Sequence, residues 1–208
     1  MPNLLKLSIL VSTIPRRINT FYPALLNKLM PQIGYRPDIE VLGLFDNKKR
    51  SVGQKRNELL QLAQGEYLTF IDDDDDIAPD YVSSVIRTLY TNPTADCVVF
   101  DCITTINGDK NNQTYSKYSI NYEYIQVPEP GPNPIDSTGR IAFQWRGKPA
   151  HTMIYKSEIA KKHIYINQNY GEDVDWVKRA CLEIKNEVRI DKVLYYYNFN
   201  SAVSETRG

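Results

Sequence analysis

Along the first half of the chain, short apolar runs alternate with longer segments that are apolar on one side only. This pattern is typical of proteins in which strands alternate with helices. Apolar runs predict strands at residues 5–11, 39–45, 67–71 and 95–106. Between them, segments with apolar residues on one side predict a helix that ends near Met30 and Pro31 and further helices at residues 51–63 and 79–90. This alternation predicts an α/β fold with a mostly parallel central sheet flanked by helices.

The second half of the chain is less regular. Asn107-Gly108-Asp109 predicts a hairpin turn at the end of the fourth strand. Residues 123–147 are rich in proline and glycine, which predicts an irregular loop that either covers an active site and binds an acceptor or merely connects two elements. Regular structure is expected again as strands at residues 151–155 and 188–197 and as helices at residues 157–162 and 173–182.

A run of five aspartates, Asp72 to Asp76, follows the strand expected at residues 67–71 and precedes Pro79, which suits the first turn of a helix. Like charges this close repel one another unless a cation lies among them. Oxygen ligands favour Mg²⁺, Mn²⁺ or Ca²⁺, and α/β sheets bind ligands at the carboxyl ends of their strands. The run therefore indicates a divalent metal site, with a solvated charged surface as the alternative.

Length and charge exclude several classes of protein. The 208 residues suffice for one domain with a full hydrophobic core. Lysine plus arginine equals aspartate plus glutamate at 25 each, so no overall field favours nucleic acid or an anionic membrane. The apolar N-terminal stretch is too short to span a bilayer, and the three cysteines follow no disulfide or metal pattern. We therefore expect a soluble cytoplasmic protein with reduced thiols, no integral membrane segment and no nucleic-acid partner.

A second acidic cluster, Gly171-Glu-Asp-Val-Asp-Trp176, lies at the start of a predicted helix. The carboxylates of Glu172 and Asp173 could simply complement the helix dipole. Together with the aspartate run, however, they give the chain one carboxylate group suited to a metal and another suited to general-base chemistry. Group transfer requires this division of labour.

The order and spacing of these motifs resemble the nucleotide-sugar glycosyltransferases of the GT-A fold, in particular the inverting family 2, over almost the whole chain. The matching residues are Ser8-Ile-Leu-Val-Ser-Thr-Ile-Pro-Arg16, Asp46, Gly53, Arg56, Asn57, Gly65-Glu66-Tyr67, Asp72, Asp74, Asp75, Pro79, Asp80, Glu172, Asp173 and Trp176. The resemblance implies one Rossmann-like GT-A domain over residues 1–208, either complete or part of a longer protein. Residues 1–106 would bind the nucleotide-sugar, and residues 107–208, with a small antiparallel portion, would bind the acceptor.

The resemblance also implies roles for individual residues. Asp74 is the expected ligand of Mn²⁺ or Mg²⁺, although five consecutive aspartates leave the register ambiguous by one position. Asp173 is the expected general base, and Glu172 would orient it or bind the acceptor. The residues expected to bind the donor are Thr13, Arg16, Asp46, Lys55, Arg56, Asn57, Asp72 and Asp73.

Two further residues are candidates for acceptor binding. Trp176 offers a flat apolar face for a sugar, but a core position on an amphipathic helix explains it equally well. His151 could lie near the diphosphate or the acceptor, whereas a lone histidine that begins a strand is more often structural.

The implied reaction is a metal-dependent, inverting transfer of a sugar from a nucleoside diphosphate donor to an acceptor hydroxyl. A UDP-sugar is the preferred donor, and a glycan or protein the expected acceptor. One alternative is a phosphatase of the haloacid dehalogenase type, but that fold places its nucleophile on an early strand. The other is a non-catalytic carbohydrate-binding module, against which the intact Asp74 and Asp173 argue.

Overall fold

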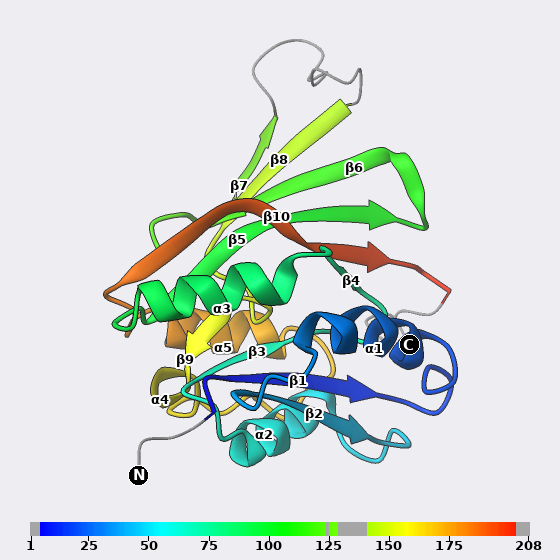
Figure 1. Ribbon diagram of the computed structural model, residues 1–208. Coiled ribbons are helices and arrows are strands. Elements are labelled where there is room, and N and C mark those ends of the chain that lie inside the picture. Colours follow the sequence, from blue (N-terminus) through cyan, green and yellow to red (C-terminus); the bar gives the residue numbers. More distant parts are fainter. Residues whose placement is uncertain (1–4, 124, 129–140, 203–208) are drawn as a thin grey trace.

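The computed structural model describes residues 5–123, 125–128 and 141–202 (Figure 1). The strands in these residues are β1 (Leu7–Thr13), β2 (Ile39–Phe45), β3 (Tyr67–Phe70), β4 (Asp76–Ile77), β5 (Cys97–Ile106), β6 (Asp109–Tyr118), β7 (Ile125–Pro128), β8 (Ile141–Gly147), β9 (Ile154–Lys156) and β10 (Glu187–Phe199). The helices are α1 (Phe21–Ile33), α2 (Val52–Leu62), α3 (Tyr81–Thr91), α4 (Ser157–Ala160) and α5 (Glu172–Ala180).

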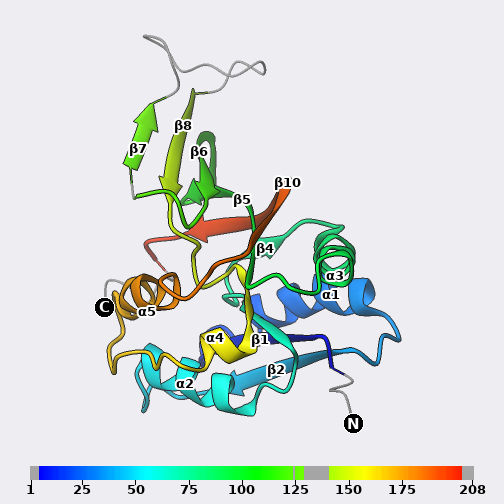
Figure 2. The same ribbon diagram turned by 90° about the vertical axis from the view of Figure 1, so that its left-hand side faces the viewer.

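All strands of the described residues join one mixed sheet. Its order is β2-β1-β3-β9-β5-β6-β8-β7, and β10 pairs with both β5 and β4. The pairs β1–β2, β1–β3, β5–β10 and β6–β8 are parallel. In Figure 2, α1 and α3 cover one face of the sheet, while α2, α4 and α5 lie on the other. The predicted α/β fold with helices on both faces is confirmed.

Strand β1, which lies between β2 and β3, is buried because helices cover both of its faces. Leu7, Ile9, Leu10 and Val11 all have 0% exposure, which explains why this strand reads as a continuous apolar run. Cys97, Cys102 and Cys181 are buried free thiols. Within the described part of the chain, no helix combines the length and apolar character that crossing a bilayer requires.

Helix α1 does not end at Met30 and Pro31 as predicted but continues to Ile33. Pro31 lies in the last turn of the helix, where its missing N–H removes only one intrahelical hydrogen bond. Ile33 is 6% exposed and follows the buried Leu29 by four positions, so the extra residues extend the apolar stripe. Burial therefore outweighs the local effect of the proline.

The prediction of an irregular loop at residues 123–147 is wrong at both ends. Residues 125–128 form β7 and residues 141–147 form β8, which runs parallel to β6. Within β8 the residues Phe-Gln-Trp-Arg alternate apolar and polar, which is typical of a strand, but the prolines and glycines nearby favoured the prediction of a loop. Residues 124 and 129–140 lie outside the described residues.

Candidate active site

A cleft of about 670 Å³ opens beyond the carboxyl ends of β1 and β3. Thr13 of β1 and Asp72 to Asp75, which follow β3, form one wall. The first turns of α2 and α5 form the second wall, and β5 and β10 form the third. This is the edge at which α/β sheets bind ligands.

The aspartates after β3, called the aspartate turn below (Asp72 to Asp75), are held by two buried arginines. The Arg17 guanidinium reaches two carboxylates, with Nη1 2.8 Å from Asp73 Oδ1 and Nη2 2.8 Å from Asp74 Oδ2. Arg56 Nη2 lies 3.3 Å from Asp72 Oδ1. Two cations therefore face the carboxylates, which leaves the turn with an excess of negative charge.

The pKa of Asp74 reflects its burial and this excess charge. Burial raises the pKa of Asp74 to about 6, and the charges of Asp72 and Asp73 act in the same direction, whereas Arg17 opposes them. The side chain of Asp74 is 16% exposed, which makes it reachable from the cleft. A further cation close to Asp74 would relieve the repulsion.

Asp75 holds the turn in place. Its Oδ2 accepts a hydrogen bond of 2.6 Å from the Tyr195 hydroxyl, and its Oδ1 accepts one of 2.9 Å from the Asn198 N–H. The same Tyr195 oxygen accepts a hydrogen bond of 3.1 Å from the Asp72 N–H. Both carboxylate oxygens are thus engaged, and strand β10 fixes the backbone of the turn.

Helix α5 brings the second acidic cluster to the cleft. Its N-cap is Gly171 with φ 76°, a left-handed conformation that glycine adopts without strain. Asp173 then lies in the first turn, where its Oδ1 accepts a hydrogen bond of 2.8 Å from the Val174 N–H. Glu172 is 4% exposed, with Oε1 3.3 Å from Arg56 Nη1. Asp173 is therefore the more exposed carboxylate, and Glu172 helps hold Arg56.

His151 links the two acidic clusters. Its Nε2 lies 3.3 Å from Asp72 Oδ2, and its Nδ1 lies 3.5 Å from Asp173 Oδ2. Burial and Arg56 act to lower the pKa of His151, but Asp72 and Asp173 raise it above its ordinary value. Burial acts to raise the pKa of Asp173, but His151 and Arg56 lower it well below the usual range of an aspartate. Asp173 is consequently ionised at neutral pH.

Helix α2 positions Arg56 and Lys55 at the cleft. Ser51 and Gln54 form a capping box, which fixes the start of the helix. Gly53 allows the helix to approach the chain closely, because a Cβ there would lie 1.9 Å from the carbonyl oxygen of Ile166. Lys55 is 3% exposed and lines the cleft, as does Arg56.

Several residues predicted to bind the donor lie elsewhere. Arg16 is exposed and does not line the cleft, and its neighbour Arg17 contacts the aspartate turn instead. Which of two consecutive arginines points inward depends on the backbone turn after β1, which the sequence alone does not define. Asp46 is buried and accepts hydrogen bonds from the N–H and Nε of Arg50 at 3.3 and 3.1 Å, and it does not line the cleft either.

The side chains of Asn57 and Trp176 form hydrogen bonds and packing contacts inside the protein. The Asn57 side chain donates to the carbonyl of Tyr165 at 2.8 Å and accepts from its N–H at 2.7 Å, which satisfies both backbone groups. Trp176 is 0% exposed, stacks on the Tyr165 ring at 5.0 Å, and donates its Nε1–H to the His163 carbonyl at 2.8 Å. Trp176 therefore lies in the core, one of the two positions that the sequence allowed, and has no exposed face.

The arrangement is compatible with one type of metal site. The described residues contain no group of three or more histidine, cysteine, aspartate and glutamate side chains that could hold a metal ion. Mg²⁺ is often bound by one or two carboxylates, with phosphate and water oxygens as the remaining ligands. Asp74, with its raised pKa, would be the protein ligand of such a site.

Three residues at the cleft were not predicted from the sequence: Arg17, Tyr195 and Tyr170. Tyr195 belongs to a segment where the resembling family often carries a histidine, so its position, but not its hydrogen bonds, was visible. Tyr170 is 73% exposed and lines the cleft beside Asp173. No periodicity marks it, because it lies in the loop before α5.

Comparison with known proteins gives a family match and several solved structures of similar fold. Residues 23–149 match the family described as glycosyl transferase family 2. Among solved structures, S. aureus TarS superposes with a TM-score of 0.65 at 18% identity, over 93% of this chain and 37% of that one. No curated protein sequence matches the chain.

Two structures of a shorter form, S. aureus TarS 1-349, carry ligands. The complex with UDP matches with a TM-score of 0.65 at 19% identity, over 93% of this chain and 60% of that one. The complex with UDP-GlcNAc matches with a TM-score of 0.62 at 19% identity, over 93% and 58% of the two chains. At these identities the likeness is one of fold, and the chain spans no more than about 60% of the matched chains.

Proposed function

The chain belongs to glycosyl transferase family 2, and from this premise we propose that it transfers a sugar from a nucleoside diphosphate donor to an acceptor hydroxyl, with a divalent metal and with inversion at the anomeric carbon. The observation that carries the proposal is that Asp173 faces the aspartate turn across the cleft, with His151 between Asp173 and Asp72. The phosphatase alternative receives no support from the family match.

A UDP-sugar is the donor that we favour. The TarS structures of similar fold bind UDP and UDP-GlcNAc, which supports this nucleotide without identifying the sugar. In this chain, Thr13, Arg17 and Lys55 line the cleft next to the aspartate turn. Lys55 and the metal bound at the aspartate turn would attract the diphosphate, because Arg17 is already paired with Asp73 and Asp74.

Asp74 is the proposed ligand of Mn²⁺ or Mg²⁺. When bound, such an ion stabilises the negative charge that develops on the departing diphosphate. Asp72 is less suited to this role because Arg56 and His151 hold it. Arg17 contacts both Asp73 and Asp74, but the side chain of Asp73 is only 2% exposed, against 16% for Asp74. The exposed fraction of Asp74 and its raised pKa therefore favour this register within the aspartate run.

Asp173 is the proposed general base. It would take the proton from the acceptor hydroxyl as that oxygen forms a bond to the anomeric carbon and the bond to the diphosphate breaks on the opposite face. A positioned base contributes about a hundred- to ten-thousand-fold to the rate. The negative charge of a bound donor would raise the pKa of Asp173 from its low value and so make it a stronger base.

The acceptor would be a glycan or glycoprotein, and Glu172 serves it indirectly. Its ion pair with Arg56 fixes the guanidinium that also faces Asp72. Glu172 would therefore hold Arg56 in position, and Asp173 would contact the acceptor hydroxyl.

The proposal is tested by calorimetric titration of UDP, GDP and dTDP with and without Mn²⁺. We expect UDP to bind in a metal-dependent manner and Asp74→Ala to remove that dependence. Asp76→Ala is the matched control, because Asp76 lies in the same run but pairs with Lys28 on α1. Binding that is equally tight without metal would contradict the assignment of Asp74.

A further inference from the structure

The cleft wall formed by β5 and β10 continues onto the neighbouring strands of the sheet. Cys102 of β5 lies opposite both Tyr195 of β10 and Ser116 of β6. Ser116 in turn lies opposite Trp145 of β8. Residues that lie opposite one another in a sheet present their side chains on the same face. Because Cys102 and Tyr195 line the cleft, Trp145 lies on the face that extends it.

A second set of side chains confirms which face this is. Tyr118 is two positions after Ser116, so it shares the same face of β6, and it lines the cleft. Tyr197 of β10 lies opposite Thr104 of β5, and both also line the cleft. The face therefore carries Tyr197 near the catalytic cluster, Tyr118 further out and Trp145 beyond it.

The composition of this face differs from that of the opposite face. Tyr197 is 36% exposed and Trp145 is 41% exposed, and the residues between them, such as Thr104 and Ser116, are small. The aromatic rings of Tyr197 and Trp145 give flat apolar steps, and the partly exposed Thr104 adds a hydroxyl group, whereas Ser116 is buried at 6% exposure. Such a surface suits a ligand with flat apolar faces and many hydroxyls.

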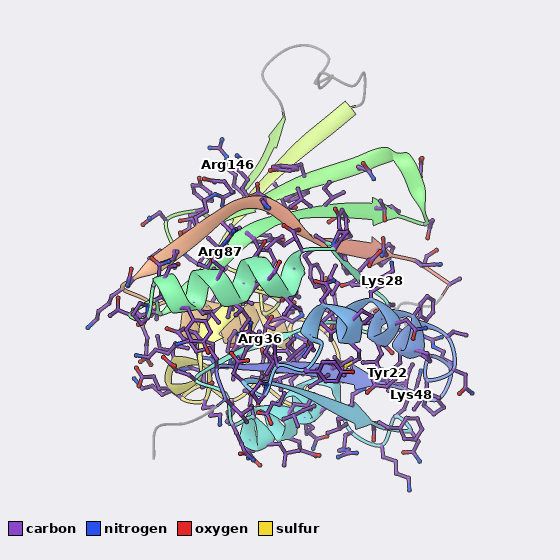
Figure 3. The ribbon with its side chains drawn as sticks, viewed as in Figure 1. Tyr22, Lys28, Arg36, Lys48, Arg87 and Arg146 are labelled. Carbon is purple, nitrogen blue, oxygen red and sulfur yellow. The ribbon has the colours of Figure 1, made fainter. Side chains whose placement is uncertain are left out.

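Two charged side chains of β6 and β8 lie on the other face. Lys117 and Arg146 are opposite one another in the β6–β8 pair, one position away from Ser116 and Trp145. Arg146 lies 5.6 Å from the centre of the Tyr122 ring. Figure 3 shows Arg146 on the part of the sheet that rises beyond β10, far from Lys28 and Tyr22 of α1. The face that extends the cleft is thus uncharged at the positions named, which argues for a neutral ligand.

The length of the face exceeds a single sugar. Neighbouring strands lie about 4.7–4.9 Å apart, so the path from β10 through β5 and β6 to β8 covers roughly 14 Å. Figures 1 and 2 show β6 and β8 projecting beyond the body of the molecule. A ligand that touched both Asp173 and Trp145 would have to be a chain of several rings.

We propose that this face, defined by Tyr197, Thr104, Ser116, Tyr118 and Trp145 and called the sheet platform, binds a linear, uncharged oligosaccharide as the acceptor. The inference rests on the proposed function and deepens it. The reacting sugar lies at Asp173, and the sugars that follow it stack on Tyr118 and Trp145. Affinity therefore rises with the number of sugar units until the chain reaches Trp145.

Tryptophan fluorescence gives a direct test, because the chain has two tryptophans and Trp176 is fully buried. Protein with UDP and Mn²⁺ is titrated with chito-, cello- and malto-oligosaccharides, from the monosaccharide upward. The longer members of one series should shift the Trp145 emission to shorter wavelength and bind about tenfold or more tightly than the monosaccharide. No change with length in any series would overturn the proposal.

Variants separate this inference from the proposed function. Trp145→Ala should lose the dependence on length in calorimetric titrations, Trp145→Phe should retain most of it, and both should bind UDP as the wild type does. Tyr35→Ala is the matched control, because Tyr35 is fully exposed and lies after α1, outside the cleft lining. Unchanged oligosaccharide binding by Trp145→Ala would overturn the platform while UDP binding stayed intact. Failure of the wild type to bind UDP would instead overturn the proposed function, and this inference with it.

Discussion

The imidazole of His151 lies against Asp173, with Nδ1 3.5 Å from Oδ2, while its other nitrogen faces Asp72. One side chain thereby connects the turn after β3 to the first turn of α5, two segments that are far apart in the sequence. A change of charge near Asp72, on the donor side of the cleft, would therefore alter the pKa of the proposed base Asp173 through His151. The expected role of His151 is therefore positioning and tuning of Asp173.

Replacing His151 should alter the pH profile of the reaction. His151 helps to hold the pKa of Asp173 below its ordinary value, so His151→Asn should raise that pKa. A base must be deprotonated to act, and the fall of kcat/KM on the acid side should therefore move to higher pH in the variant. Steady-state rates across the acidic and neutral range test this, with His163→Asn as the control because His163 pairs with Glu183 instead. An unmoved acid limb would remove His151 from this role.

Arg17 should matter to stability far more than Arg16. Removal of Arg17 leaves the buried Asp73 and the largely buried Asp74 without their common cation, and breaking a buried ion pair in this way costs about 3–5 kcal/mol. Arg17→Ala should thus lower the free energy of unfolding by about that amount, whereas the exposed Arg16→Ala should change it by less than about 0.5 kcal/mol. Denaturant titration of both variants measures the difference. Equal losses would contradict the placement of the two arginines.

Asn57→Ala should destabilise the fold without removing a donor contact. The substitution leaves the N–H and the carbonyl of Tyr165 without their partner, at about 1–3 kcal/mol for each group left unsatisfied. The UDP affinity of the folded variant should remain within about threefold of the wild type. Gln61→Ala, at an exposed position of the same helix, is the control. A large loss of affinity with unchanged stability would restore Asn57 as a donor-binding residue.

The two tryptophans should behave in opposite ways. Trp176→Ala removes a fully buried ring and should lower the free energy of unfolding by about 3–5 kcal/mol. Trp145 is 41% exposed, so Trp145→Ala should change it by no more than about 1 kcal/mol. Thermal or denaturant unfolding of both variants is the measurement. Similar losses would show that Trp145 is part of a packed core and would weaken the sheet platform.

Patterns that depend on local sequence were predictable. The apolar run of β1 and the step from β3 into the aspartates follow from hydrophobicity and charge alone, and both lie where they were expected. The capping box at Ser51 likewise marks the start of α2. These features need no knowledge of distant contacts.

Features that depend on tertiary contacts were not predictable. Pro31 stays within α1 because burial of Ile33 outweighs the lost hydrogen bond, and β8 forms because β6 offers a partner. Trp176 and His151 each fitted two interpretations, and only their neighbours decide between them. His151 meets two carboxylates, whereas Trp176 meets the Tyr165 ring.

The central claim, that Asp173 is the general base of a sugar transfer, is tested most directly with Asp173→Asn. The measurement is turnover of the UDP-sugar that the wild type binds most tightly, together with its affinity in the presence of Mn²⁺. We expect near-normal affinity and a turnover about a hundred- to ten-thousand-fold lower, with Asp175→Asn as the control because Asp175 pairs with Arg179 on the same helix. Turnover equal to that of the wild type would contradict the account.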